Sequence, residues 1–133
     1  MRLQGVASYD PFGDDKSEHP ERVADATDGD PATYWTTSTY DDFSATKEGV
    51  GLVLDAGSSR DLSSLTVTTD SPGFQAEIRS GASRAGPFET VVGPSQTVGA
   101  KTTWTIDGDD ARFYAIWITD LDGNAHINEV KAN

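Results

Sequence analysis

The chain has 133 residues, 35% of them hydrophobic, which suits one folded domain with a single core over residues 1–133. With 22 Asp and Glu against 10 Lys and Arg, its net charge is −12. Nucleic acids and anionic membrane surfaces are therefore poor partners, because both are bound through clustered basic residues.

Cysteine is absent from the chain, which excludes disulfide bonds, a thiolate zinc site and a cysteine nucleophile. No apolar run is long enough to span a bilayer, and no signal peptide is visible. We expect the domain to be excised from a larger membrane protein whose other segments carry the membrane or secretion signals. This fragment itself is not expected to insert into the membrane.

The predicted elements are one short helical turn followed by many short strands. The turn is expected over residues 19–26, because Pro20 suits the start of a helix. The strands alternate apolar and polar residues and are separated by turn residues. They cover residues 50–57, 62–69, 74–80, 86–93, 102–110, 112–120 and 126–132. This pattern predicts an all-β fold, a β-sandwich of jelly-roll type, and the lack of crossover helices excludes a parallel α/β sheet.

Two of the predicted strands carry more detail. Residues 112–120 are apolar at nearly every position, which is typical of a central strand that is buried on both faces. In the last strand, Ile127 and Val130 are three residues apart and so cannot share one face of a regular strand. We therefore expect a bulge or a weakly patterned edge there.

An acidic loop, residues 28–30, precedes Thr33 and a tryptophan, Trp35. Carboxylate, hydroxyl and carbonyl oxygens are the ligands that calcium prefers, and Gly29 can turn the backbone sharply. The loop does not match an EF-hand, because alanines occupy the places where that motif needs acidic residues. An Asp-Gly pair is also an ordinary turn signal, so a cation loop and a simple turn both remain open.

The stretch "ATDGDPATYWTT" resembles the signature of discoidin or coagulation-factor C-type domains, which belong to the galactose-binding-like superfamily. The strands "GVGLVLDAG" and "ARFYAIWIT" and the ending "INEVKA" follow in the order that this family shows, so the resemblance covers most of the chain. It implies a jelly-roll sandwich and a role like that of the many bacterial carbohydrate-binding modules in the superfamily.

More narrowly, "VASYDPFGDDKSEHPE", "DGDPATYWTT" and "GVGLVLD" together look like a branch found at the extracellular C-terminal end of actinobacterial membrane proteins. These proteins include transmembrane serine/threonine protein kinases and homologues of the flippase for lipid-linked peptidoglycan precursors. This resemblance implies an extracellular or cell-surface location as part of a membrane-anchored parent protein.

In many sugar-binding members of the superfamily, a structural calcium ion ties the acidic loop to the last strand. Carried over to this chain, the resemblance implies a Ca²⁺ site formed by the side chains of Asp28, Asp30, Thr33 and Glu129, with nearby backbone carbonyls. Some members lack the metal, and Asp28 and Glu129 would then form hydrogen bonds or pair with Lys or Arg.

We expect Trp35 and Trp117 to lie in the core, since large aromatic residues are mostly buried. Aromatics near turns could instead stack on a sugar ring; they are Tyr9, Phe12, Tyr40, Phe43, Phe74 and Trp104. Of the residues that could contact a ligand, we select four: Tyr40, Phe43, Arg79 and His126. The alternative for each is ordinary packing.

The sequence contains no HExxH, no GxSxG and no phosphate-binding glycine loop with lysine, so we predict that the domain is not an enzyme. Two functions remain. The first is a module that recognises a glycan or cell-wall polymer, and the second is a protein-interaction or spacer domain without a sugar site. The family's usual Arg, His and Asn pattern around an aromatic is not clearly present, which favours the second. The resemblance, the acidic loop and the loop aromatics favour the first, which we take as the predicted function.

Overall fold

A computed structural model describes residues 3–9, 20–30, 32–37, 49–60, 62–81, 83, 88, 90–106, 111–121 and 125–132. Its elements are β1 (Gln4–Tyr9), the 3₁₀ turn η1 (Pro20–Ala26), β2 (Trp35–Thr36), β3 (Val50–Arg60), β4 (Ser64–Thr68), β5 (Gln75–Gly81), β6 (Thr90–Thr97), β7 (Lys101–Thr105), β8 (Ala111–Asp120), β9 (His126–Ile127) and β10 (Glu129–Ala132). No helix of these residues is long and apolar enough to cross a membrane.

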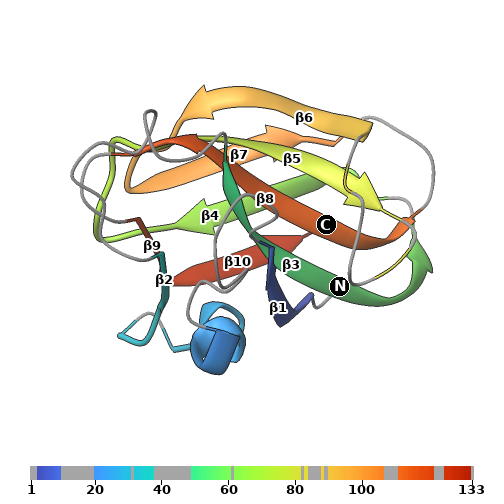
Figure 1. The fold of residues 1–133 in the computed structure, drawn as a ribbon, viewed down its shortest axis with the longest axis horizontal. Helices are drawn as coiled ribbons and strands as arrows, with labels where there is room; N and C mark the ends of the chain where they lie inside the picture. The colour runs from blue at the N-terminus through green and yellow to red at the C-terminus, as the bar shows by residue number, and fades with distance from the viewer. Residues whose placement is uncertain are drawn as a thin grey trace.

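The strands form two facing sheets and one short pair (Figure 1). The larger sheet has the order β1-β3-β8-β5-β6, the smaller sheet the order β10-β4-β7, and β2 pairs with β9. Every strand pair is antiparallel. This arrangement confirms the predicted all-β sandwich of jelly-roll type.

The main core lies between the two sheets, where alternate residues of each strand are buried. Its largest fully buried side chains include Trp35, Trp104, Tyr114, Leu52, Leu54, Leu65, Ile78 and Ile116. The prediction for Trp35 is confirmed. Trp104 (0% exposed) and Phe74 (2% exposed), considered above as sugar-stacking residues, belong to this core and are not available to a ligand.

β8 is the central strand of the larger sheet and is buried on both faces, as its sequence predicts. One face contributes to the main core. On the other face, Phe113 and Ala115 form a second cluster with Val53 and Phe88. Trp117, also buried, contacts Tyr9 across this outer face, with ring centroids 5.5 Å apart. We call this group on the far side of the larger sheet the outer cluster.

The chain ends in two short strands separated by Asn128, which explains why Ile127 and Val130 differ in parity. β9 pairs with β2, whereas β10 pairs with β4 in the smaller sheet. The Asn128 amide donates to the Thr68 carbonyl at 2.9 Å, so the chain passes between the sheets without losing a backbone hydrogen bond. The predicted irregularity is confirmed, and its cause is a change of partner strand.

β6 begins at Thr90 and continues to Thr97, further than the sequence pattern predicts. It continues through Pro94, which cannot donate to a neighbouring strand. β6 is the edge of the larger sheet, where proline is tolerated because one side of the strand needs no partner.

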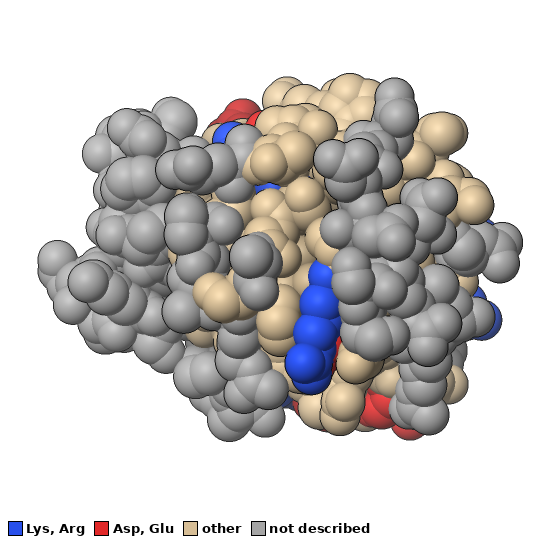
Figure 2. Space-filling model, turned by 90° about the vertical axis from the view of Figure 1, so that its right-hand side faces the viewer, with Lys and Arg blue, Asp and Glu red and all other residues tan. Residues whose placement is uncertain are grey.

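Charged side chains are spread over the described surface. On the face shown in Figure 2, the described Lys and Arg side chains stand apart from one another, and some of them lie beside Asp or Glu.

Replacing Gly5 by alanine should destabilise the fold, because β1 approaches η1 too closely to leave space for a side chain. A Cβ at Gly5 would clash with the Val23 carbonyl oxygen, which belongs to the backbone and cannot turn away. We expect Gly5→Ala to lower the free energy of unfolding by about 1–3 kcal/mol in urea titrations. Gly99→Ala is the control, since the nearest atom to its added Cβ is 3.8 Å away. Equal stability of the two variants would contradict the close approach.

Candidate functional site

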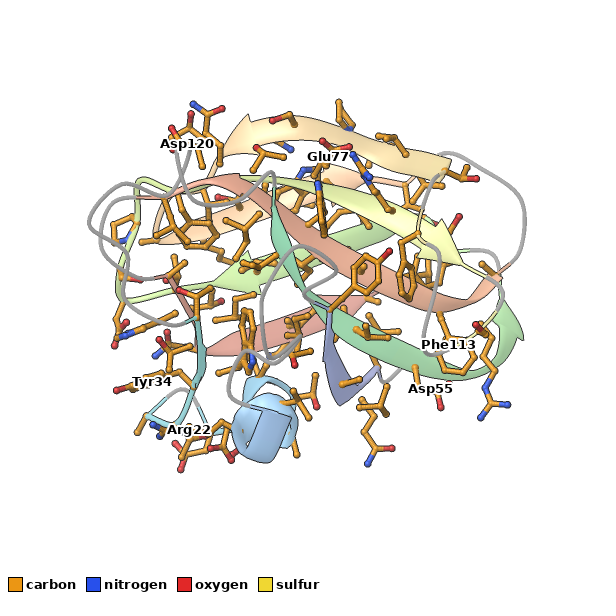
Figure 3. All side chains as sticks on the ribbon, in the orientation of Figure 1. Arg22, Tyr34, Asp55, Glu77, Phe113 and Asp120 are labelled. Atoms are coloured by element: carbon orange, nitrogen blue, oxygen red, sulfur yellow. The ribbon has the colours of Figure 1, made fainter. Side chains whose placement is uncertain are left out.

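Tyr34 and His126 stack on each other at one end of the sandwich. Tyr34 directly precedes β2 and His126 begins β9. Their ring centroids are 4.0 Å apart and the rings are inclined by only 14°. The guanidinium group of Arg22, from η1, lies over the Tyr34 ring at 4.8 Å, and Figure 3 shows the two side chains beside each other. We call Arg22, Tyr34 and His126 the aromatic stack.

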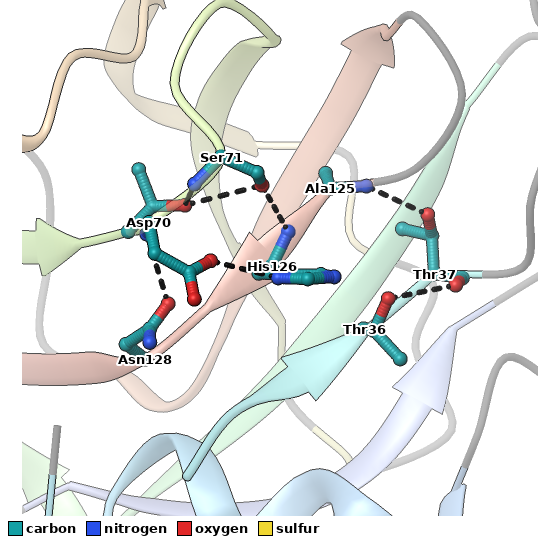
Figure 4. A network of polar contacts seen from close by, with 8 residues as sticks. Thr36, Thr37, Asp70, Ser71, Ala125, His126 and Asn128 are labelled. Atoms are coloured by element: carbon teal, nitrogen blue, oxygen red, sulfur yellow. Dashed lines mark hydrogen bonds and ion pairs between the residues drawn. The ribbon is translucent and has the colours of Figure 1, made fainter. Parts of the chain in front are cut away.

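Asp70 lies beside the stack, in the turn between β4 and β5. Its Oδ1 is 2.7 Å from the His126 Nδ1, and its backbone amide donates to the Asn128 Oδ1 at 3.1 Å. The His126 amide donates to the Ser71 Oγ at 2.8 Å, so the turn is held to β9 at several points (Figure 4). The Asp70 side chain remains 56% exposed and that of His126 20% exposed.

The pKa of Asp70 is lowered by its neighbours. Partial burial raises the pKa, but hydrogen bonds from His126 and Asn128 and the charge of His126 outweigh that effect. The pKa therefore lies below its ordinary value of 3.8, and the carboxyl group is ionised near neutral pH.

Thr37 fixes the segment that follows β2. Its amide donates to the Ala125 carbonyl at 3.0 Å, and its hydroxyl oxygen accepts from the Ala125 amide, also at 3.0 Å. Thr37 and Ala125 are both buried. These bonds extend the β2–β9 pairing beyond its two-residue register and hold His126 in place (Figure 4).

The acidic loop turns sharply and is tied to the last strand. Gly29 has φ 81°, a conformation that glycine adopts without steric cost. Its amide donates to the Glu129 Oε2 at 3.2 Å. Within the loop, the Asp28 Oδ1 accepts from the Asp30 amide and the Asp30 Oδ1 accepts from the Ala32 amide, both at 2.9 Å.

Oxygen atoms converge around the Thr33 hydroxyl. It donates to the Asp28 Oδ2 and lies 3.0 Å from the Asp30 carbonyl oxygen and 3.4 Å from the Asp25 carbonyl oxygen. The bonds from Thr33 and from the Asp30 amide lower the pKa of Asp28, more than burial raises it. A groove of about 350 Å³ opens beside this loop; it is lined by Leu3, residues 27–29 and β10.

The loop offers oxygen ligands only, which are the ligands of calcium. No group of three or more His, Asp or Glu side chains in the described residues is arranged to hold a metal ion. The side chain of Asp30 points to the Ala32 amide, while its carbonyl oxygen faces Thr33. A cation here would therefore depend on Asp28, Glu129 and backbone carbonyl groups more than on Asp30.

The four predicted ligand contacts have different locations. His126 lies in the aromatic stack. Arg79 lies in the outer cluster: its Nε is 3.1 Å from the Glu77 Oε2, and its guanidinium group is 5.0 Å from the Trp117 ring centre. The structure therefore does not bring Arg79 to His126. Tyr40 and Phe43 are outside the residues that the structure describes.

Sequence reasoning did not select Arg22, Tyr34 or Asp70. Tyr34 stands inside the loop motif, next to a core tryptophan, so its local sequence does not mark it as a ligand contact. Asp70 occupies a Thr-Asp-Ser-Pro-Gly turn, where aspartate is common for backbone reasons alone. Only the tertiary structure shows that Tyr34 and Asp70, far apart in the chain, both contact His126.

Comparison with solved structures gives the fold. A carbohydrate-binding module 32 of AlyQ, in complex with 4,5-unsaturated mannuronic acid, has a TM-score of 0.70 and 18% identity, covering 100% of this chain and 98% of that one. Chitosan-binding module 2, in complex with chitotriose, from a Paenibacillus sp. IK-5 chitosanase/glucanase has a TM-score of 0.64 and 20% identity, covering 82% and 83%. The chain has the galactose-binding-like, or discoidin, fold.

A fucosidase of Ruminococcus gnavus in complex with fucose contains the same fold, with a TM-score of 0.64 and 18% identity. The comparison covers 98% of this chain, which spans about 24% of the length of the fucosidase. No protein-family model and no curated protein matches the chain in sequence.

The contact between His126 and Asp70 should be visible in an NMR titration of the Asp70 carboxyl carbon. We expect a midpoint below 3.8 in the wild-type domain and a higher midpoint in His126→Phe, which keeps a ring for Tyr34 but removes the nitrogen. Because the folded pKa is depressed, the contact stabilises the fold above about pH 4 and is lost as the pH falls through the folded pKa. An unchanged midpoint in the variant would show that His126 does not act on Asp70.

Proposed function

We propose that this galactose-binding-like domain is a non-catalytic module that binds a glycan at the aromatic stack. The observation that carries the proposal is the partly exposed stack with the Asp70 carboxylate beside it. The apolar face of a pyranose ring packs on aromatic rings, and its hydroxyl groups donate to carboxylate and imidazole acceptors. Arrangements of a few fixed polar groups around aromatic surface are typical of small-ligand sites.

The neighbours in fold support the choice of a glycan as the ligand. Two of the structures compared above are binding modules of this fold, and they hold chitotriose and an unsaturated mannuronic acid. Their identities to this chain are 20% or less, so the particular sugar does not carry over. The proposal therefore rests on the stack, and the neighbours indicate the class of ligand.

Ser71, His126 and Asp70 lie together, yet their geometry favours binding over catalysis. In a serine triad the hydroxyl oxygen faces the imidazole ring, which takes its proton. Here the Ser71 Oγ accepts from the backbone amide of His126 instead, and its own amide donates to the Thr69 Oγ1. Ser71 thus serves to position the turn, and Asp70 and His126 remain available as hydrogen-bonding groups.

The alternative role as a protein-interaction domain receives less support. In the part of the chain that the structure describes, Val91 is the one large apolar side chain classed as exposed, at 49%. It lies on the edge strand β6. A single exposed apolar residue does not form the patch that a docking surface needs.

We also propose that the acidic loop binds Ca²⁺ and that the ion stabilises the loops without taking part in binding chemistry. The donors would be the carboxylates of Asp28 and Glu129, the Asp25 and Asp30 carbonyls and the Thr33 hydroxyl. The oxygens of Asp25, Asp28 and Asp30 already surround the Thr33 hydroxyl, and Glu129 is joined to the loop through the Gly29 amide. Such a mixed set of oxygen ligands suits calcium's flexible coordination.

The resemblance to ectodomains of membrane kinases and flippase homologues supports a location for the glycan. We propose that the domain is the extracellular part of a membrane-anchored parent protein and that it recognises cell-wall material. Purified cell-wall fragments therefore belong in the binding screen beside defined glycans.

Binding to a glycan array and to cell-wall fragments, with calcium present, tests the proposed site. We expect Tyr34→Ala to weaken binding about tenfold, because it removes the ring on which His126 packs and so disrupts the aromatic stack. Tyr34→Phe keeps the ring and should bind like the wild type. Tyr40→Ala and Phe43→Ala test the two predicted loop aromatics in the same screen. If Tyr34→Ala still binds the same glycan with wild-type affinity, the site does not lie at the aromatic stack. If the array shows no binding at all, the proposed function is wrong.

Removal of calcium should lower the melting temperature if the acidic loop holds the ion. We expect a loss of several degrees on adding a chelator, since an ion bound only to the folded state stabilises it. In Asp28→Asn the loop loses a charged donor, so the chelator should have little further effect. The same melting temperature with and without chelator in the wild type would rule out a structural ion.

A further inference from the structure

We propose that Asp70 makes this site select sugars that carry a protonated amine, such as glucosamine, over neutral sugars and, most strongly, over uronic acids. This inference rests on the proposed function of the aromatic stack as a glycan site. It concerns which sugar the site prefers and assigns Asp70 the role of specificity-determining residue.

The first argument is that the Asp70 carboxylate is both exposed and fixed in position. More than half of the side chain, 56%, is in contact with solvent. Its backbone is held by the bond from its amide to Asn128, and its Oδ1 is held by His126. Because the Asp70 carboxylate is already fixed in position, a ligand group that binds it causes little further loss of side-chain conformational entropy.

The second argument is that the described arginine side chains are engaged elsewhere, so that among the described residues His126 is the ion-pair partner of Asp70. Arg22 touches the stack through Tyr34, but its Nε lies 3.6 Å from the Asp25 carboxylate, which offsets its charge. Arg79 is engaged with Glu77 in the outer cluster. Arg112 pairs with Asp55 at the opposite end of the sandwich from Tyr34 (Figure 3).

Further negative charge lies at the same end. Asp120 ends β8 and pairs in register with Gln75, directly after the turn that carries Asp70. It is exposed, and Figure 3 places it at the end of the molecule that also holds Tyr34. With a net charge of −12 on the whole chain, the long-range field also attracts cations and repels anions. Among the described residues, His126 contacts Asp70 and, when protonated, would weaken this field.

The third argument concerns hydrogen-bonding capacity. An ionised carboxylate only accepts hydrogen bonds, and an ammonium group offers three charged donors. Charge-assisted bonds of this kind are about twice as strong as neutral ones. A sugar hydroxyl or an acetamide N–H offers one neutral donor, and the carboxylate of a uronic acid offers none. The expected order of affinity is therefore amine, then neutral sugar, then uronic acid.

The test is isothermal titration of the domain with three oligosaccharides of equal length, made of glucosamine, N-acetylglucosamine and mannuronic acid, at about pH 6, where carboxylates are ionised. We expect the glucosamine oligomer to bind about tenfold more tightly than its acetylated form. Raising the ionic strength should reduce this difference, because salt screens the charge on an exposed carboxylate.

Asp70→Asn should abolish the preference for the amine and keep binding of the acetylated oligomer. Asp120→Asn is the matched control, since it removes an equal charge from the same end and should keep the preference. The salt dependence of the wild type tests the idea without any variant. Three results would each overturn the inference while leaving a glycan site. They are equal affinity for the amine and acetylated oligomers, tighter binding of the mannuronic acid oligomer, and an unaltered preference for the amine in Asp70→Asn. Failure of all three oligomers, together with a blank glycan array, would overturn the proposed function as well.

Discussion

The pairing of β2 with β9 is the constraint on which the candidate site depends. Trp35 and Ile127 are opposite each other in this pair and are both completely buried. Since successive residues of a strand point to opposite sides, burying this pair turns their neighbours Tyr34 and His126 outward. The hydrophobic effect on two core residues thus places two surface rings against each other. The pairing thus joins two residues that are 92 positions apart in the sequence.

The same pairing brings the acidic loop to the end of the chain. The loop lies just before β2, and Glu129 lies just after β9 and Asn128. The bond from the Gly29 amide to Glu129 joins residues 100 positions apart in sequence. The aromatic stack and the acidic loop therefore share their supporting backbone, at residues 33–36 and 126–129. An ion that holds the loop would also restrain the segment that carries Tyr34.

The two sheets provide rigid support, and the segments between strands provide the chemistry. β8 is packed on both faces, by the main core on one side and by the outer cluster on the other, so the larger sheet has little freedom to move. Arg22, Tyr34, Asp70 and Ser71 all come from turns or from segments next to strand ends. This division explains how structures at 20% identity or less keep the sandwich while holding different sugars. Packing needs only apolar residues of suitable volume, whereas a sugar needs particular polar atoms in particular places.

The amino-acid sequence by itself determined the fold class and most of its strands, because alternation of apolar residues is a local property that survives without tertiary information. It also identified Trp35 and Trp117 as buried, the double burial of β8 and the irregularity between Ile127 and Val130. It indicated His126 as a ligand contact and the acidic loop as a candidate cation site, and the family resemblance predicted that Glu129 lies at that loop.

Only the tertiary structure decided that Arg79 belongs to the outer cluster and that Phe74 and Trp104 are core residues. It alone joined Tyr34, Asp70 and His126, since which turn meets which strand depends on sheet order and register. Those depend on the packing of the whole chain, and no local pattern in the sequence records them.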